Sequence, residues 1–349
     1  YIDNGKVGKK SISEGDVRKY INNILKPTTH SWLKEVGSNV MKQGVKDASL
    51  ALQRYFKGLS GKPKFKSKHK DRPSFYVNYE SLSRKQGGFQ GEKIGFVKTS
   101  EALPKLNKNE KYSNPRITFD GKYWYLSVGY EVQESTVELT DESLGIDLGV
   151  KDLAICSNGK VYKNINKTQR VKKLEKKLKR EQRKLSRKIE NNIQSYKSNR
   201  NPIYKRPLKE CQNIQKQNRL IRNIHRKLAN IRQNHLHQTT TEIVKTKPSR
   251  IVMESLNVSG MMKNKHLSKV IQQQKIYEFQ RQIEYKSKLN EIEFIQVDEF
   301  YPSSKTCSCC GNIKKDLKLS DRMYKCDVCG LVIDRDYNAS INLANYEVI

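Results

Sequence analysis

The chain has 349 residues, of which 35% are hydrophobic, and it carries a formal net charge of +33. Its length predicts roughly two or three domains, and no apolar run approaches the roughly 20 residues that a membrane-spanning helix needs. A surface this basic repels itself unless a polyanion neutralises it, so nucleic acid is the expected partner and membrane association is not expected. No secretory segment opens the chain, and a cytoplasmic location is expected.

Two helices are predicted near the start of the chain. The first is expected at 14–26, because Pro27 ends it. The second is expected at about 38–57, where apolar residues recur at spacings of three and four and predict one buried stripe. The stripe consists of Met41, Val45, Ala48, Leu52 and Phe56.

A lysine-rich loop and a β-rich stretch follow these helices. Residues 58–70 carry a lysine at nearly every second position, which is typical of a solvated loop. Phe65 among the lysines favours a loop that tracks phosphates, with Lys64, Lys66 and Lys68 as candidate contacts. Residues 74–132 are rich in strand-forming residues and contain the hairpin signal Asp120-Gly121. Several strands in a small barrel or sandwich are therefore expected.

The pattern changes at 144–150, a short apolar strand that contains Asp147. Strands are predicted at 151–157 and 160–162, followed by helices at about 167–190 and 208–246 that form an antiparallel hairpin. Between 167 and 232 the sequence has 23 Lys and Arg against 4 Asp and Glu, more than half of the net charge. A solvated helix face would carry both signs, so this hairpin is predicted to contact nucleic acid. Its candidate contacts are Lys172, Lys173, Lys176, Lys177 and Arg180.

The remaining elements surround a cysteine module. An apolar strand at 250–255 contains Glu254, a helix is predicted at 268–290, an alternating strand at 291–298 and a closing helix at 336–346. Between the last two, two C-x2-C pairs are separated by fifteen residues, each directly followed by a glycine. This spacing predicts a closed tetrahedral zinc site, which is structural because it has no open position. The predicted ligands are Cys307, Cys310, Cys326 and Cys329.

Three acids are candidates for a second metal site. Phosphodiester cleavage commonly uses two divalent cations, and hard Mg²⁺ prefers carboxylate oxygens. Asp147 and Glu254 lie in apolar strands, where a lone acid is costly unless it is paired or holds a metal. Asp336 opens the closing helix, and taken alone it is more simply a helix cap. Asp334 competes with Asp336 for the third position, and the strand-edge acids Asp152 and Asp298 are weaker candidates.

Several segments resemble motifs of the TnpB family, whose members are transposon-encoded RNA-guided DNA endonucleases similar to the compact type V CRISPR effectors. The most specific segments lie in the last half of the chain, and the match covers nearly all of it. They are GIDLG at 145–149, IVMESL at 251–256, YPSSKTCSCCG at 301–311 and CGLVIDRDYNA at 329–339, with SWLKEV at 31–36 and PKFKSK at 63–68 in the N-terminal half.

The resemblance implies a RuvC-type nuclease with an RNase H-like core, in which Asp147, Glu254 and Asp336 hold Mg²⁺ or Mn²⁺ and the four cysteines hold structural zinc. Asp336 is chosen over Asp334 because, in the related effectors, the catalytic acid directly precedes an aromatic-Asn-Ala segment. Guide RNA and target DNA are the implied partners, and a monomer is the expected state. The implied fold is a multi-domain α/β protein, with a helical recognition lobe at 1–70, a wedge-like β-barrel at 71–140, the nuclease at 141–303 and 334–349 with the basic hairpin at about 167–246, and the zinc ribbon at 304–333.

Two other functions remain open from the sequence. Strand-transferring transposases also use an RNase H-like fold, but they typically carry Asp, Asp and Glu in that order, whereas this chain has Asp, Glu and Asp. A non-catalytic nucleic-acid-binding regulator is the other alternative. It is favoured by one departure from the family pattern, because relatives usually begin with a further strand and helix, and an N-terminally truncated copy is therefore expected.

Overall fold

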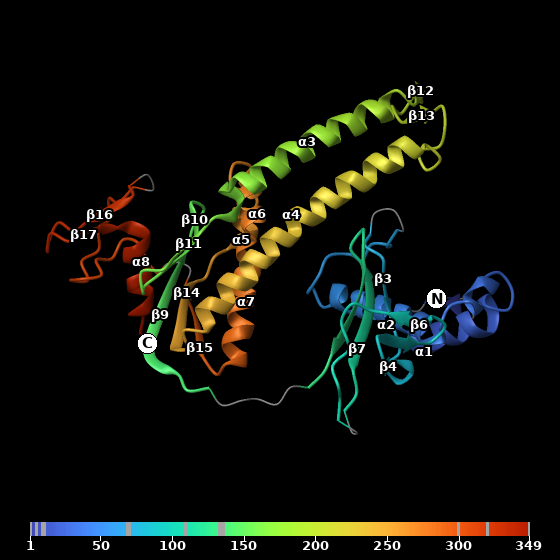
Figure 1. Ribbon diagram of the computed structural model, residues 1–349, viewed down its shortest axis with the longest axis horizontal. Coiled ribbons are helices and arrows are strands. Elements are labelled where there is room, and N and C mark those ends of the chain that lie inside the picture. Colours follow the sequence, from blue (N-terminus) through green and yellow to red (C-terminus); the bar gives the residue numbers. More distant parts are fainter. Residues whose placement is uncertain are drawn as a thin grey trace. The chain divides into compact units, whose positions relative to one another are not determined.

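The computed structural model describes residues 2–3, 6–7, 12–67, 71–107, 110–131, 137–298, 301–318 and 321–347. The chain forms two compact units, Tyr1–Val132 and Gln133–Ile349, which are coloured blue to teal and green to red in Figure 1. None of the helices in the described residues combines the length and the apolar character that a membrane span needs.

The first unit opens with helices close to the predicted positions. Helix α1 continues into a five-residue π-helical segment, so that 14–25 is helical, and the side chain of Ser13 caps the first turn of α1 by accepting from the amide of Asp16. The elements in chain order are β1 Ile2–Asp3, β2 Lys6–Val7, α1 Glu14–Tyr20, η1 Ile21–Leu25, η2 Ser31–Lys34 and α2 Ser38–Phe56.

The predicted buried stripe of α2 is wrong. No residue of this helix is buried, and Leu52 and Phe56 near its end are 46% and 75% exposed. Polar contacts hold the helix instead: Glu92 accepts hydrogen bonds at its N-terminus, and Asp47 forms an ion pair with Arg116, with 3.1 Å between Oδ2 and Nη2. The spacing of the apolar residues thus predicted the helix correctly but not the surface that covers it.

Apart from the short β1-β2 pair, the strands described in the first unit form two three-stranded antiparallel sheets. The orders are β3-β7-β8 and β4-β5-β6, and one apolar cluster that includes Phe89 and Ile117 lies between them. The predicted hairpin is present, with Phe119 paired to Trp124 across the turn. The bounds are β3 Ser74–Tyr76, η3 Tyr79–Ser81, β4 Ser83–Lys85, β5 Gly88–Gly91, β6 Gly95–Lys98, β7 Ser113–Phe119 and β8 Trp124–Gly129.

The second unit is built on a five-stranded mixed sheet of order β11-β10-β9-β14-β15. Strand β9 pairs antiparallel with β10 and parallel with β14, which in turn is parallel to β15. All five strands lie where the sequence predicted strands. Their bounds are β9 Thr140–Leu148, β10 Asp152–Cys156, β11 Val161–Lys163, β14 Pro248–Glu254 and β15 Glu293–Val297.

Helices cover both faces of this sheet (Figure 1). Ile251 and Met253 face α4 and α7 in the main core, whereas Val252 between them packs with Leu343 of α8 on the other face. This alternation is the normal period of a strand whose two faces are both covered. The helices are α4 Gln212–Val244, α7 Ile276–Leu289 and α8 Arg335–Ala344.

The predicted helical hairpin is an arm that extends from the sheet (Figure 1). It consists of α3 Gln169–Glu190, which follows the short η4 Ile165–Lys167, and of α4. Val171, Ile224 and Leu228 form the buried seam between the two helices. A short antiparallel ribbon of β12 Ile193–Tyr196 and β13 Pro202–Tyr204 joins them and was not predicted.

The single helix predicted at 268–290 is wrong, because the chain breaks at Lys275. This residue has a φ of 55°, in the left-handed region, and separates α6 Ser268–Gln274 from α7. The side-chain amide of Gln274 donates to the carbonyls of Gly149 and Val150 at 2.8 and 3.1 Å. Those contacts fix the end of α6 next to the loop that follows β9. The remaining elements are α5 Val258–Met261, β16 Met323–Lys325 and β17 Val332–Asp334.

Candidate functional site

Strand register brings two of the predicted acids together. Ile146 of β9 pairs with Met253 of the parallel strand β14, and the next residues along these strands are Asp147 and Glu254. Their neighbours Ile146 and Met253 both belong to the core under α4 and α7. Because successive side chains alternate across a strand, Asp147 and Glu254 project from the opposite face. Two carboxylates therefore stand side by side at the carboxyl ends of neighbouring strands.

Helix α8 lies on that same face and carries Asp336 in its first turn. The close packing depends on Gly145, two residues before Asp147, because a Cβ at this position would collide with the backbone of Ser340 and Ala344. The competing acid Asp334 is the N-cap of α8 and accepts from the amides of Asp336 and Tyr337 at 3.0 and 3.1 Å. The structure thus gives Asp334 a structural role.

The three carboxylates interact electrostatically. Desolvation raises the pKa of Asp147 well above its usual value, and the negative charges of Glu254 and Asp336 raise it further, whereas Arg335 opposes the shift. Asp336 contacts two arginines, with 3.4 Å to Nη2 of Arg335 and 4.0 Å to Nη1 of Arg322. Within the described residues, the carboxylate of Asp147 accepts no hydrogen bond. An acid that is desolvated, unpartnered and next to other acids is suited to a cation.

The four predicted cysteines converge, unlike the three acids. In the part of the chain that the structure describes, they form the one group of three or more Cys, His, Asp or Glu side chains whose ligand atoms all lie within 4.8 Å of one another. The Sγ atoms of Cys307 and Cys329 are 3.6 Å apart, as are those of Cys310 and Cys326. The remaining thiol of the module, Cys309, is exposed and outside the group.

The backbone of the module fits thiolate ligands. Gly311 and Gly330, directly after each cysteine pair, have φ of 74° and 73°, which a side chain would disfavour. The amides of Cys329 and Val328 donate to Cys326 Sγ and lower the pKa of this thiol to about 6. Tyr324 is fully buried beneath the pairs. Four convergent sulfurs, among them the stabilised thiolate of Cys326, are the donor set that Zn²⁺ prefers.

The predicted nucleic-acid contacts are accessible where they are described. Five of them lie on α3, in the arm, and two lie in the lysine-rich loop at 58–70, whereas Lys68 of that loop lies outside the described residues. Arg180 also bonds to Glu181, a buried acid that accepts from Gln217 of α4 at 3.0 Å and holds the two helices together. The exposed residues are Lys64, Lys66, Lys172, Lys173, Lys176, Lys177 and Arg180.

The two weaker acid candidates lie at strand ends. Asp152 forms an ion pair with Lys163 at 3.4 Å, and Asp298 directly follows β15.

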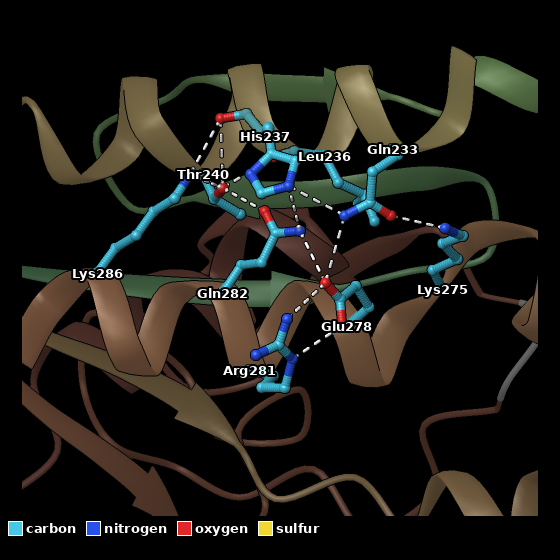
Figure 2. A network of polar contacts seen from close by, with 9 residues as sticks. All are labelled: Gln233, Leu236, His237, Thr240, Lys275, Glu278, Arg281, Gln282 and Lys286. Carbon is cyan, nitrogen blue, oxygen red and sulfur yellow. Dashed lines mark hydrogen bonds and ion pairs between the residues drawn. The ribbon is translucent and has the colours of Figure 1, made fainter. Parts of the chain in front are cut away.

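A polar network between α4 and α7, missed at the level of sequence, braces the base of the arm. Figure 2 shows Glu278 at its centre, accepting from Arg281, Gln282 and Gln233. The Arg281 guanidinium is the main reason that the pKa of Glu278 is lowered to about 2. His237 lies 3.0 Å from the side-chain nitrogen of Gln233.

The same helix also reaches the acids. The amide of Gln280 in α7 donates to the backbone carbonyl of Glu254 at 3.1 Å, while Gln274 of α6 holds the loop after Asp147. Both glutamines are buried. The one signal in the sequence that could have indicated these contacts is the presence of glutamines among the core residues of α7.

Fold and site together define a mixed α/β protein with two acids at the ends of neighbouring parallel strands, a third acid at the start of α8, and a four-cysteine module. Two family models match the chain. Residues 127–265 match OrfB_IS605, described as "Probable transposase", and residues 277–343 match the "Cas12f1-like, TNB domain".

The chain belongs to the TnpB family, as its motifs predicted. It is 30% identical over 359 aligned residues to the "Putative RNA-guided DNA endonuclease InsQ" of Escherichia coli (strain K12), covering 98% of this chain and 82% of that one. It is 26% identical to a "Putative RNA-guided DNA endonuclease" of Streptomyces pristinaespiralis, over 90% and 72% of the two chains. Among solved structures, the fold resembles the Cas12f1 chain of a complex with guide RNA and target DNA, with a TM-score of 0.54 and 16% identity, over 98% of this chain and 76% of that one.

Proposed function

We propose that this protein is an RNA-guided, divalent-metal-dependent DNA endonuclease encoded by an insertion sequence. The observation that carries the proposal is the placement of Asp147 and Glu254 at adjacent ends of parallel strands, on the face where α8 presents Asp336. The mixed sheet with an acid on its first strand supports an RNase H-like, RuvC-type core. The net charge of +33 supports a polyanionic guide and target.

The acids would hold the metal ions in this mechanism. Divalent ions, when bound there, supply an activated water on one side of the phosphodiester and neutralise the leaving oxygen on the other. Asp147 has no competing hydrogen-bond donor in the described residues, so its oxygens are open to a cation. Arg322 and Arg335 lie beside Asp336 and add positive charge where a phosphate would enter. The cytoplasm, where guide and target meet, is the proposed site of action.

The other predicted parts enter the proposal with their sequence-based roles. Cys307, Cys310, Cys326 and Cys329 would hold a structural zinc ion, and the exposed lysines of the arm would follow the phosphates of the guide RNA. The proposed division is a recognition lobe at 1–70, a wedge-like barrel at 71–140, the nuclease at 141–303 and 334–349, and the zinc ribbon at 304–333. The β-sheets of the first unit and the four-cysteine module support this division.

The test combines RNA sequencing with cleavage. The chain is expressed with its flanking transposon end, the RNA that co-purifies is sequenced, and DNA matched to that RNA is incubated with the complex and Mg²⁺. We expect one discrete RNA and site-directed cutting that Asp147→Asn abolishes without loss of RNA. Asp152→Asn, on the adjacent strand and paired with Lys163, is the matched control and keeps activity.

The result also separates the alternatives. Random co-purifying nucleic acid with no cleavage would refute the proposal and favour a binding regulator. The name "Probable transposase" of the matching family model favours strand transfer as the second candidate. Strand transfer would yield joined DNA products rather than free hydrolysed ends, and it would not need a guide RNA.

A further inference from the structure

A single buried hydroxyl contacts one of the proposed metal ligands. The Oγ–H of Ser303 donates a hydrogen bond to Oε1 of Glu254. Ser303 is 2% exposed and lies 49 residues further along the chain, in the segment that leads into the four-cysteine module. The second oxygen of this carboxylate, Oε2, accepts no hydrogen bond from any described residue. One oxygen of Glu254 is thus held by the protein, and the other is left for a cation.

The serine is in turn held by helix α8. The side-chain amide of Asn342 donates to the carbonyl of Ser303 at 2.7 Å and to the carbonyl of Thr306 at 2.7 Å. One turn earlier, Asn338 donates to the same Thr306 carbonyl at 2.7 Å and accepts from the amide of Ser308 at 3.0 Å. Both asparagines are buried, so these contacts are shielded from water.

The two asparagines stand on one face of α8 because they are four residues apart. That face contacts the segment 303–308, which leads into the first cysteine pair. The same helix carries Asp336 in its first turn. Helix α8 therefore fixes the position of the cysteine module relative to two acids. It holds Glu254 through Ser303, and it carries Asp336 itself.

We infer that Ser303 is a positioning residue, which orients the Glu254 carboxylate for a divalent cation and makes the metal site depend on the seating of the cysteine module against α8. A glutamate has three rotatable bonds, and a carboxylate left free at the edge of a sheet samples several rotamers. The hydroxyl selects one of them and bonds to the charged form, as the hydrogen-bonded partners of metal-ligating carboxylates do. The inference rests on the proposed function, in that it takes Glu254 as a metal ligand.

The test measures Mn²⁺ binding directly, in addition to cleavage. The zinc-loaded chain is titrated with Mn²⁺, and the free ion is followed by electron paramagnetic resonance. Zinc content and melting temperature are recorded for each variant. We expect Ser303→Ala to weaken Mn²⁺ binding by about 10- to 100-fold with unchanged zinc content. Ser303→Thr, which keeps the hydroxyl, restores much of the affinity. The Mg²⁺ concentration for half-maximal cleavage shifts in the same order.

Thr306→Val is the matched control. The Thr306 hydroxyl lies in the same segment but donates to the carbonyl of Pro302 at 2.9 Å and bonds to no acid among the described residues. It should leave Mn²⁺ binding unchanged. If Ser303→Ala does not fold, Ser303→Cys keeps the volume with a weaker donor, and an intermediate loss is expected.

The outcomes separate this inference from the proposed function. Ser303→Ala that binds Mn²⁺ as the wild type does, or Thr306→Val that loses as much, overturns the inference while cleavage stands. Wild-type protein that takes up no Mn²⁺ overturns it as well. If Mn²⁺ binding by the wild type is weakened by Ser303→Ala but the wild type cuts no DNA, the inference is supported and the endonuclease proposal is refuted.

Discussion

Replacing Gly145 by alanine tests whether the close packing of α8 on β9 places the third acid. The φ of Gly145 lies outside the left-handed region, so the backbone itself accepts alanine. A Cβ would nevertheless overlap the carbonyl oxygen of Ser340 and the amide of Ala344, and it would lie 3.0 Å from the carbonyl carbon of Leu343. These are backbone atoms of α8, so the whole helix has to move rather than one side chain.

Two consequences are expected from this shift. Overpacking of this kind lowers the free energy of unfolding by about 1–3 kcal/mol. Because α8 carries Asp336, a displacement of about 1 Å at the site also lowers the cleavage rate by about 100-fold. The loss of activity should therefore exceed what the loss of folded protein explains.

The assay follows unfolding in urea by far-ultraviolet circular dichroism, with cleavage measured under conditions where the variant is fully folded. Both tryptophans, Trp32 and Trp124, lie in the first unit, so their fluorescence transition serves as an internal reference and should not move. Gly44→Ala in α2 is the control substitution: a Cβ there meets nothing within 4 Å, and helix propensity should stabilise the first unit by about 0.5–1 kcal/mol. Gly145→Ala with wild-type stability and wild-type cutting would refute this reasoning.

Three further predictions concern the cysteine module and the arm. Cys326→Ser should lose bound zinc and lower the melting temperature of the second unit, and unchanged zinc content would contradict the ligand assignment. The pKa of Glu181 is lowered from 4.5 to about 2, mainly by the hydrogen bond from the side-chain amide of Gln217. The Glu181 carboxylate therefore stabilises the fold fully above pH 4.5 and progressively less toward pH 2. Urea unfolding of Glu181→Gln should lack that part of the pH dependence, and a wild-type pH profile would count against it. Lys173→Ala and Lys176→Ala should each reduce the slope of log affinity for RNA against log salt by about 0.7–0.9, and slopes equal to that of the wild type would exclude phosphate contacts there.

Elements with strong local signals could be predicted from the sequence. The strands containing Asp147 and Glu254 are short apolar runs with one acid each, so both strands could be predicted from local sequence. Once β9 pairs with β14, strand alternation places both acids on one face. The convergence of the four cysteines was predictable because an i, i+3 spacing with a following glycine specifies each turn by itself. In each case the information lies within a few residues.

What could not be predicted depends on tertiary contacts. Nothing local in the helix at 268–290 requires a break at Lys275; the left-handed residue is held by contacts such as those of Gln274 with the loop after β9. Phe56 at the end of α2 is exposed because no other element in the described residues packs over it. The periodicity of apolar residues predicts the apolar face of a helix but not the element that covers it. Ser303 reads as one of two serines before a cysteine, and its contact with Glu254 spans 49 residues.

The choice between Asp334 and Asp336 shows how structure adds to a motif. Both acids lie in the same short segment, and either one could belong to a metal site on residue type alone. The cap geometry separates them, because Asp334 already satisfies two amides of α8 with one oxygen. Giving that oxygen to a cation would leave two helix amides without a partner, at a cost of about 0.5–2 kcal/mol. Within the described residues, Asp336 makes no such contact, has the larger effect on the pKa of Asp147, and forms ion pairs with Arg335 and the exposed Arg322. We therefore propose Asp336, which does not cap the helix, as the third acid of the site.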